Sequence, residues 1–570
     1  MLVNCLSMSL VLKTKAGPST VSPWDSETRL LAWLATCVAV FSFLFYFQRG
    51  DVLLYGDAVA HLNIARRVFD SKTPGLLQLG TVWLPLPHLL MIPFLISKEM
   101  WQRGVGGSMP SLVAYVFGVV GMFRLVRGSL AGRDKPDVLA HLAAWSAAVV
   151  YAVNPNLIYM QTTAMGESLY LALFIWAVIY FSESRREGGK ALTKCGLCLA
   201  AACLTRYDAW FLAVAMAALI VVLSFRSGKA VTENTIEISR GAALKFVLIA
   251  AAAPALWLAY NGVVYRNPLE FQNGPYSAKA IERRTQSAGN PGHPGSGDLI
   301  VAGLYFLKSG EANMAENQWL GRLWVALGIA TLLAAAPGVR LRLNAAINPV
   351  RGAGLPFLLL LVPVPFYALS VAYAGVPIFI PAWWPFTHYN VRYGLQLLPA
   401  FAMAFAVLVY LVVRAEQLRP RLRLAAVLGV FAVFVVSYAS IWRAGPVCLI
   451  EAEINMRSRN QLEAQLAVWL GNLPPSSTLL MYLGDHVGAV EQAGIPLKQV
   501  INEGNHRVWK QPVDPDGLWE RALANPAQYA DFVVAFEGDP VWQAVHPRQL
   551  AELVEIRVTG QARAIVYRAR

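Results

Sequence analysis

Long apolar segments recur along most of the chain, and they constrain its fold more than any other feature. A helix crosses a bilayer with ~20 mainly apolar residues, because it satisfies its backbone hydrogen bonds internally. Of the 570 residues, 56% are hydrophobic and 14% are charged, which is outside the range of soluble globular chains. The sequence therefore predicts a polytopic membrane protein. The apolar segments are Leu30–Phe47, Ser111–Val126, Val138–Val153, Leu169–Phe181, Cys195–Leu204, Ala209–Phe225, Phe246–Tyr260, Trp319–Ala336, Leu355–Tyr373, Tyr393–Val413 and Leu424–Trp442.

One further apolar stretch, Trp83–Ile96, has about 14 residues and three prolines, which favours an interfacial or re-entrant segment over a span. If it does not cross, the connections rich in Lys and Arg all lie on the side of the N-terminus. The positive-inside rule then predicts about 11 crossings, a cytoplasmic N-terminus and an extracytoplasmic C-terminus. The net charge of +14 arises from these Lys- and Arg-rich connections, so it does not indicate a nucleic-acid partner.

Three regions follow from this topology. We predict a cytoplasmic tail over residues 1–29, a transmembrane domain over 30–445 with large outer loops at 48–110 and 263–318, and a small extracytoplasmic α/β domain over 446–570. The expected fold class is thus an all-α polytopic membrane protein of about 11 transmembrane helices with a small C-terminal α/β domain. In that domain, periodicity predicts a helix at Leu449–Leu470 and strands at Thr478–Leu483, Asp531–Phe536, Val554–Val558 and Ala564–Tyr567.

The second outer loop contains the Gly- and Pro-rich stretch Gly289–Gly297, which is expected to lack regular structure. A mobile lid or acceptor-binding loop and a plain connector both fit this composition.

The first outer loop contains Tyr55–Arg67, which is unusually polar for a segment beside a membrane. At helical spacing, Asp57 and His61 lie four residues apart on one face. Asp57 either presents a carboxylate at the membrane surface or merely caps the N-terminus of an interfacial helix after Gly56, and the segment alone favours neither.

Further polar residues collect on the same side of the predicted membrane. Glu167 begins one span, Arg206 and Asp208 lie in a short turn, and His388 and Arg392 precede another span. Taken singly, the two arginines are explained by snorkelling to the interface. Together, two carboxylates and two guanidiniums facing one compartment provide a base for a hydroxyl and a clamp for a phosphate.

These residues lie in a series of short motifs spread along the chain: Tyr55-Gly-Asp57, Asn154-Pro155, Met165-Gly-Glu-Ser-Leu-Tyr170, Leu204-Thr-Arg-Tyr-Asp208 and Val391-Arg-Tyr-Gly-Leu-Gln-Leu-Leu-Pro399. In order, and over most of the membrane part, they resemble the motifs of the GT-C type membrane glycosyltransferases, in the bacterial branch similar to protein O-mannosyltransferases and lipid A aminoarabinose transferases. This chain departs from the usual pattern at Tyr207, where proline is usual, and at Met165–Gly166, where a polar residue more often precedes the acid.

The resemblance implies a sugar donor linked to polyprenyl phosphate and an inverting transfer to a lipid, glycan or protein acceptor on the outer face of the bacterial inner membrane. It also implies an acidic base in the first outer loop, which matches Asp57, and we assign catalysis to Asp57 and Glu167. Substrate binding is assigned to His61, Arg206, Asp208, His388 and Arg392. No cofactor is expected, because Asp57 and His61 alone do not make a divalent-metal site.

The main alternative is a secondary transporter or a flippase for lipid-linked sugars. Such proteins also have about a dozen spans and buried charges, but their charges lie near the middle of the membrane. Here the charges lie at the outer ends of the spans, which favours the transferase.

Overall fold

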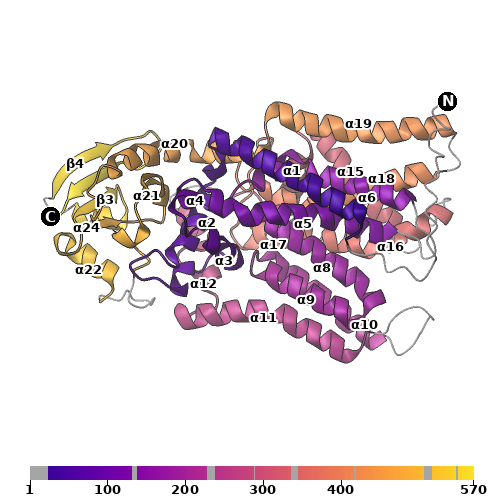
Figure 1. Cartoon of the computed structure of the whole chain (residues 1–570), viewed down its shortest axis with the longest axis horizontal. Coiled ribbons are helices and arrows are strands. Elements are labelled where there is room, and N and C mark those ends of the chain that lie inside the picture. The colour runs from indigo at the N-terminus through magenta and orange to yellow at the C-terminus, as the bar shows by residue number, and fades with distance from the viewer. Residues whose placement is uncertain are drawn as a thin grey trace.

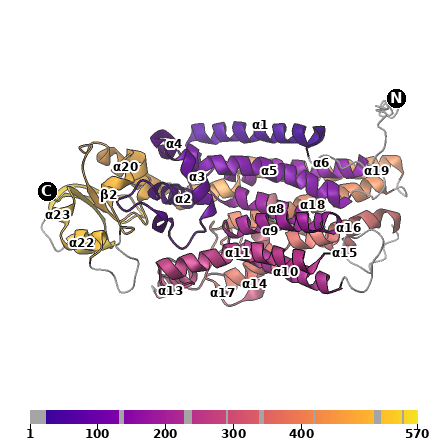
Figure 2. The same cartoon turned by 60° about the horizontal axis from the view of Figure 1, so that its bottom comes forward.

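A long helical bundle with a small sheet at one end makes up the molecule (Figure 1). The computed structural model describes residues 24–130, 138–226, 238–287, 289, 291–335, 344–415, 419–505, 516–546 and 550–570. Most of the predicted tail 1–29 and parts of several Lys- and Arg-rich connections lie outside these ranges. The first helix, α1 (Ser26–Arg49), begins at the end of the bundle that is far from the sheet and runs toward the sheet (Figures 1 and 2).

Seven stretches of the described chain are helical, long and apolar enough to cross a membrane, which makes this a multi-pass integral membrane protein. Two shorter apolar helices, Val138–Ala152 and Asp208–Ser224, accompany them. The predicted membrane fold is confirmed at this level, and each of the eleven apolar segments lies largely within helical structure. The long stretches are Ser26–Arg49, Val105–Leu130, Arg240–Val264, Gln318–Ala335, Gly352–Tyr373, Val391–Arg414 and Pro420–Leu470.

The helices of the bundle run along its long axis and pack side by side (Figure 1). Small residues allow close packing; for example, Ala143, Ala144 and Ala147 on α6 are fully buried. The bundle helices are α1 (Ser26–Arg49), α5 (Val105–Leu130), α6 (Val138–Ala152), α7 (Pro155–Met160), α8 (Glu167–Glu187), α9 (Gly189–Cys203), α10 (Asp208–Arg226), α11 (Arg240–Val264), α15 (Gln318–Ala335), α16 (Asn344–Leu360), α17 (Pro363–Tyr373), α18 (Leu398–Arg414) and α19 (Pro420–Ala444).

The stretch between α1 and α5 forms short helices at the end of the bundle that carries the sheet (Figure 1). The segment Trp83–Ile96 contains only α3 and η4, with prolines near the start of each, and is not a candidate span. The elements are η2 (Asp51–Leu53), α2 (Gly56–Arg67), η3 (Leu76–Leu79), α3 (Leu86–Met91), η4 (Ile92–Phe94) and α4 (Lys98–Gln102).

The second predicted outer loop, 263–318, contains three helices, whereas the described residues of the Gly- and Pro-rich stretch 289–297 form no helix or strand, as the sequence predicts. The helices are α12 (Glu270–Asn273), α13 (Ala278–Ser287) and α14 (Leu299–Met314). The Gly- and Pro-rich stretch between α13 and α14 is tied down by His293, whose Nε2 lies 2.8 Å from the carbonyl oxygen of Val371. The following helix α14 buries one face, which includes Ala302, Tyr305 and Phe306.

The C-terminal region is the predicted α/β unit. Its sheet has the order β2-β1-β3-β5-β4, with β2, β1 and β3 parallel and β5 and β4 antiparallel. The four predicted strands are present, and β2 was missed because it is only two residues long. The elements are α20 (Val447–Leu470), β1 (Leu479–Met481), α21 (Val487–Ala493), η6 (Leu497–Gln499), β2 (Val500–Ile501), α22 (Leu518–Ala524), α23 (Pro526–Tyr529), β3 (Phe532–Phe536), α24 (Pro540–Val545), β4 (Ala551–Ile556) and β5 (Ala564–Arg568).

The two faces of this sheet belong to different hydrophobic cores. Leu479 and Met481 belong to the core that runs on into the helical bundle, whereas Leu480 belongs to a separate core that includes Trp519 and Val541 of α22 and α24. This division follows from the alternation of side chains along a strand. The sheet is therefore packed firmly onto the bundle and not tethered by a linker.

Candidate functional site

Four elements bring the predicted site residues together at the end of the bundle that carries the sheet. Asp57 lies in the first turn of α2, Glu167 is the first residue of α8 and Asp208 is the first residue of α10. Arg206 lies in the turn before α10, and Arg392 lies in η5 (Val391–Leu397). The structure thus joins five of the seven predicted residues in one charged network.

The short helix η5 is held against α14, the helix that replaces the predicted loop. Asn313 of α14 donates from Nδ2 to the carbonyl oxygen of Val391, at 2.8 Å. Gly394 permits this close approach, because a Cβ there would collide with the backbone of Ser309. Asn390, directly before η5, has a φ of 56°, in the left-handed region that Asn tolerates. The position of Arg392 is therefore set by packing between distant segments.

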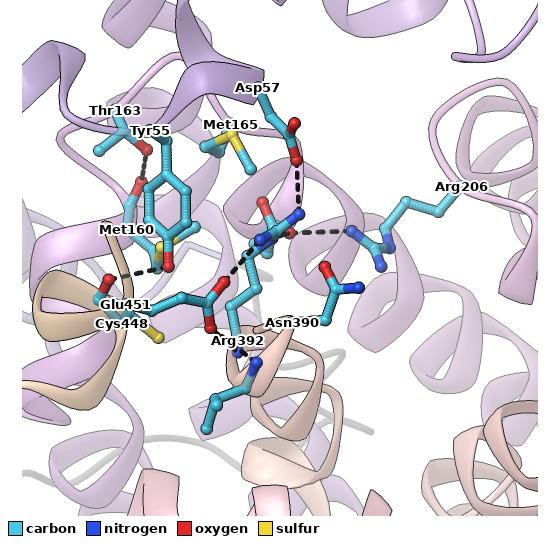
Figure 3. Close-up of polar contacts among 12 residues, drawn as sticks. Tyr55, Asp57, Met160, Thr163, Met165, Arg206, Asn390, Arg392, Cys448 and Glu451 are labelled. Atoms are coloured by element: carbon cyan, nitrogen blue, oxygen red, sulfur yellow. Dashed lines mark hydrogen bonds and ion pairs between the residues drawn. The ribbon is translucent and has the colours of Figure 1, made fainter. Parts of the chain in front are cut away.

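Arg392 is the centre of the network (Figure 3). Its Nη2 lies 2.5 Å from Oδ2 of Asp57, its Nη1 lies 2.7 Å from Oε1 of Glu451, and its Nε lies 3.5 Å from Oε1 of Glu167. The guanidinium also lies over the rings of Tyr55 and Tyr393, at 5.1 and 5.2 Å from their centroids. A buried guanidinium is thus surrounded by three carboxylates and two aromatic faces.

Arg206 and Glu167 extend the network toward α10. Arg206 donates from Nη1 to Oε1 of Glu167 at 2.9 Å, and from Nη2 to the hydroxyl of Tyr367 at 2.7 Å. Its Nε lies 3.5 Å from Oδ2 of Asp208, which accepts a hydrogen bond from the Tyr367 hydroxyl at 3.3 Å. The same Glu167 oxygen faces Arg206 and Arg392, so Glu167 fixes the spacing of the two guanidiniums.

Glu451, near the start of α20, is a site residue that sequence reasoning missed. Its Oε1 pairs with Arg392, and its Oε2 accepts from the backbone N–H groups of Val391 at 2.6 Å and Arg392 at 3.3 Å. In the sequence, Glu451 was marked only by its place on the apolar side of the predicted helix. Its partner Arg392 lies 59 residues earlier in the chain, so the pairing could not be predicted locally. The C-terminal domain therefore contributes a buried carboxylate to the network.

Solvent access separates Asp57 from the other carboxylates. The side chain of Asp57 is 38% exposed, whereas those of Glu167, Asp208 and Glu451 are 1–2% exposed. Asp57 also does not cap its helix, because the N-cap of α2 is Tyr55 and no side chain caps it. The capping interpretation is therefore excluded, and Asp57 is the carboxylate of the network that is open to solvent.

His61 forms a pair with a second histidine. Its Nδ1 lies 2.7 Å from Nε2 of His88, and the ring of Trp83 packs against it at 4.8 Å between centroids. Burial lowers the pKa of His61 and of His88, so both imidazoles are neutral at pH 7 and one donates to the other. Asp57 and Glu167 are close enough to act on the charge of His61, which places this pair beside the network.

His388 is not joined to the network. Its backbone carbonyl accepts a hydrogen bond from Nδ2 of Asn455 at 3.0 Å, and its side chain is half-buried. It lies two residues before Asn390, where the chain turns into η5.

The network contains more negative than positive groups, with four carboxylates for two guanidiniums. Among the described residues, no group of three or more His, Cys, Asp or Glu side chains is placed to hold a metal ion. The two arginines are the positive groups of this network.

The fold of the described residues is similar to that of the solved structures of ArnT. The crystal structure of ArnT from Cupriavidus metallidurans in the apo state matches 96% of this chain and 99% of that chain, at 14% identity and a TM-score of 0.52. The structure of the same protein bound to undecaprenyl phosphate matches the same shares at 13% identity and a TM-score of 0.50. The archaeal oligosaccharyltransferase AglB from Archaeoglobus fulgidus matches 90% of this chain and 69% of its own, at 13% identity and a TM-score of 0.44.

No protein-family model matches the sequence, and no curated protein matches it. The resemblance read from the short motifs is confirmed at the level of the fold.

Proposed function

We propose that this protein is a membrane glycosyltransferase that moves a sugar from a polyprenyl-phosphate donor to an extracytoplasmic lipid, glycan or protein acceptor. The observation that carries the proposal is a reachable carboxylate, Asp57, held on the guanidinium of Arg392 at the end of a GT-C bundle. The structure of ArnT with undecaprenyl phosphate supports a polyprenyl-phosphate donor.

The chemistry requires one base and a positively charged phosphate site. In an inverting displacement, the acceptor hydroxyl oxygen attacks the anomeric carbon, its proton passes to Asp57, and the bond from that carbon to the phosphate oxygen breaks. The leaving polyprenyl phosphate is stable, so no strong general acid is needed. Arg206 and Arg392 stabilise its charge in a poorly solvated site. One carboxylate then suffices, unlike in hydrolysis by glycosidases.

The pairing of Asp57 with Arg392 gives the site a simple order of events. The donor phosphate competes with Asp57 for Nη2 of Arg392, because both are anions and this nitrogen bonds to Asp57 in the structure. Donor binding therefore frees the Asp57 carboxylate for the acceptor hydroxyl.

The remaining residues hold these groups in place. Glu167 and Glu451 fix the arginines, and Asp208 with Tyr367 holds Arg206. His61, oriented by His88, is assigned to a sugar hydroxyl. His388 stays a prediction as a substrate ligand.

We further propose about 11 crossings of the bacterial inner membrane, with the site and the C-terminal domain on the outer face. The end of the bundle that holds the network also holds the C-terminal domain (Figure 1), which agrees with one shared compartment. A transporter would be expected to hold its charged residues near the middle of the membrane, so a network at the end of the bundle does not support that alternative.

The proposal is tested by mass spectrometry of envelope lipids and glycans from a deletion strain. One glycan or lipid species should lose a sugar, and wild-type protein should restore it while Asp57→Asn should not. An unchanged envelope, with accumulation of a transported solute instead, would contradict the proposal.

A further inference from the structure

The two buried histidines beside the charged network can carry their protons in only two ways. Nδ1 of His61 lies 2.7 Å from Nε2 of His88, so one proton lies between these two nitrogens. Burial lowers the pKa of both rings, and a neutral imidazole has a single N–H. The two protons are therefore either both on Nε2 or both on Nδ1.

The surroundings of His88 decide between these two distributions. His88 is fully buried, and its Nδ1 has no hydrogen-bond partner among the described residues. A proton on this nitrogen would be a buried N–H without an acceptor, which is rarer in proteins than a buried acceptor without a donor. The proton of His88 is thus favoured on Nε2, from which it is donated to Nδ1 of His61. This leaves the proton of His61 on its own Nε2.

The segment that carries His88 is held against the turn before α10. The backbone N–H of Leu86 donates to the carbonyl oxygen of Leu204 at 2.9 Å. Tyr207, which stands where proline is usual, donates from its hydroxyl to the carbonyl oxygen of Val82 at 3.1 Å. These two bonds fix the segment on both sides of Trp83, so the ring of His88 is positioned by the turn that also carries a guanidinium of the network.

The same segment also lies against the start of α8. A Cβ on Gly166, the residue before Glu167, would lie 3.8 Å from Pro87 and 3.8 Å from Thr205. The histidine pair is therefore wedged between α2 and the two turns from which Glu167 and Arg206 reach the network.

Nε2 of His61 is the nitrogen of the pair that is left for a ligand. His61 lies one turn after Asp57 on the same face of α2. Among the described residues, His88 is the only hydrogen-bond partner of the His61 side chain, and the ring of Trp83 packs against it at 4.8 Å between centroids. Two sides of the imidazole are thus occupied, and the N–H group has no partner within the protein.

We infer that His88 fixes His61 as a hydrogen-bond donor, so that Nε2–H of His61 binds an oxygen of the transferred sugar beside Asp57. A hydroxyl or ring oxygen has the lone pair that this N–H requires, whereas a protonated amino group has none. The sugar therefore presents an uncharged oxygen at this position. His88 does not touch the sugar and is a positioning residue.

The location agrees with the transferred sugar. In the proposed reaction, on which this inference rests, the sugar lies between the phosphate on the two guanidiniums and the base, and His61 lies one turn from that base. A neutral N–H suits an uncharged oxygen, while the phosphate is met by Arg206 and Arg392.

Solid-state NMR on the full-length protein in lipid bilayers, with isotope-labelled histidine, measures the proton positions without any substrate. The signals of His61 and His88 are assigned by their loss in His61→Gln and His88→Gln. Both rings should be neutral at pH 7 with the proton on Nε2. A proton on Nδ1 of either ring would overturn the inference.

Transfer in membranes of the complemented deletion strain tests the role of His88. His88→Leu should lower the initial rate of sugar addition about tenfold, as expected for the loss of one oriented hydrogen bond. His88→Gln should keep most of the rate, because its amide can still donate to Nδ1 of His61. The matched control is His546→Leu, which changes an exposed histidine and should transfer like wild type. A wild-type rate in His88→Leu would overturn the inference.

A double variant separates positioning from a general structural role. His61→Leu should lower the rate at least as much as His88→Leu, and the variant with both changes should be no slower than His61→Leu alone, because His88 acts only through His61. Losses that add would show that His88 acts independently and would overturn the inference. The melting temperature of His88→Leu should equal or exceed that of wild type, since the change removes a buried polar atom without a partner.

Binding of undecaprenyl phosphate, a probe without a sugar, distinguishes the failure of this inference from that of the proposed function. All of the histidine variants should bind it like wild type. Weaker binding in His61→Leu would mean that His61 faces the phosphate and that the sugar assignment is wrong. If wild-type protein neither bound undecaprenyl phosphate nor restored a sugar, the proposed function would be refuted, whereas the NMR experiment would still report which nitrogen of His61 donates.

Discussion

The substitution Asp57→Asn tests the proposed base, because it preserves the shape of the side chain and removes its ability to take a proton. Loss of a general base typically lowers the rate 10² to 10⁴-fold. At about 1.4 kcal/mol for each factor of ten, this is a loss of about 2.8 to 5.6 kcal/mol of transition-state stabilisation.

The structure predicts that the protein itself tolerates this change. Asp57 is 38% exposed, so its ion pair with Arg392 is screened and contributes at most about 1 kcal/mol. Arg392 also keeps Glu451 at 2.7 Å, and the amide oxygen of Asn can still accept its hydrogen bond. The melting temperature should therefore stay close to that of wild type.

The same substitution should not weaken binding of the donor lipid. Since the phosphate and Asp57 compete for the same nitrogen of Arg392, removing the negative charge should leave undecaprenyl phosphate binding unchanged or make it tighter. A protein damaged at its site would instead bind the lipid more weakly.

The assay compares Asp57→Asn with wild type in a purified transfer reaction, with donor binding and melting measured on the same samples. A fall in turnover with intact donor binding supports the base. Near-wild-type turnover would refute it and would move the base to Glu167, the buried carboxylate that faces both guanidiniums.

Three further predictions concern the two arginines, Glu451 and the orientation of the protein in the membrane. Arg206→Lys and Arg392→Lys should each weaken undecaprenyl phosphate binding tenfold or more, because an ammonium cannot make paired hydrogen bonds to a phosphate; normal affinity in both would mean that these arginines only anchor helices. Glu451→Gln should lower the free energy of unfolding by about 1 to 3 kcal/mol, because one of its two accepting oxygens becomes a donor that faces other donors; a melting curve unchanged from that of wild type would contradict this. Ser476→Cys, at an exposed position, should react with a membrane-impermeant maleimide in whole cells, whereas the natural Cys448 is fully buried and should not; labelling of Ser476→Cys only after lysis would reverse the predicted orientation.

The sequence by itself determined the membrane character of the chain and pointed to most residues of the charged network. The apolar segments could be read directly, because a backbone in lipid has to satisfy its own hydrogen bonds within each helix. Asp57, Glu167, Arg206 and Arg392 were recognised because charge at the ends of apolar segments is costly and so stands out. The strands β1, β3, β4 and β5 were visible in the same way, from local periodicity.

Only the tertiary structure decided how these residues are paired. The partner of Asp57 lies 335 residues away, and Glu451 joins the site because α20 packs beside η5. The Gly and Pro signal before α14 correctly indicated a stretch without regular structure, but its contact with α17 through His293 could not be read from the sequence. Arg66 and Arg67 look alike in sequence, yet Nε of Arg66 donates to Asp70, whereas Nε of Arg67 has no partner among the described residues. Such differences depend on contacts between distant segments, which local sequence patterns do not encode.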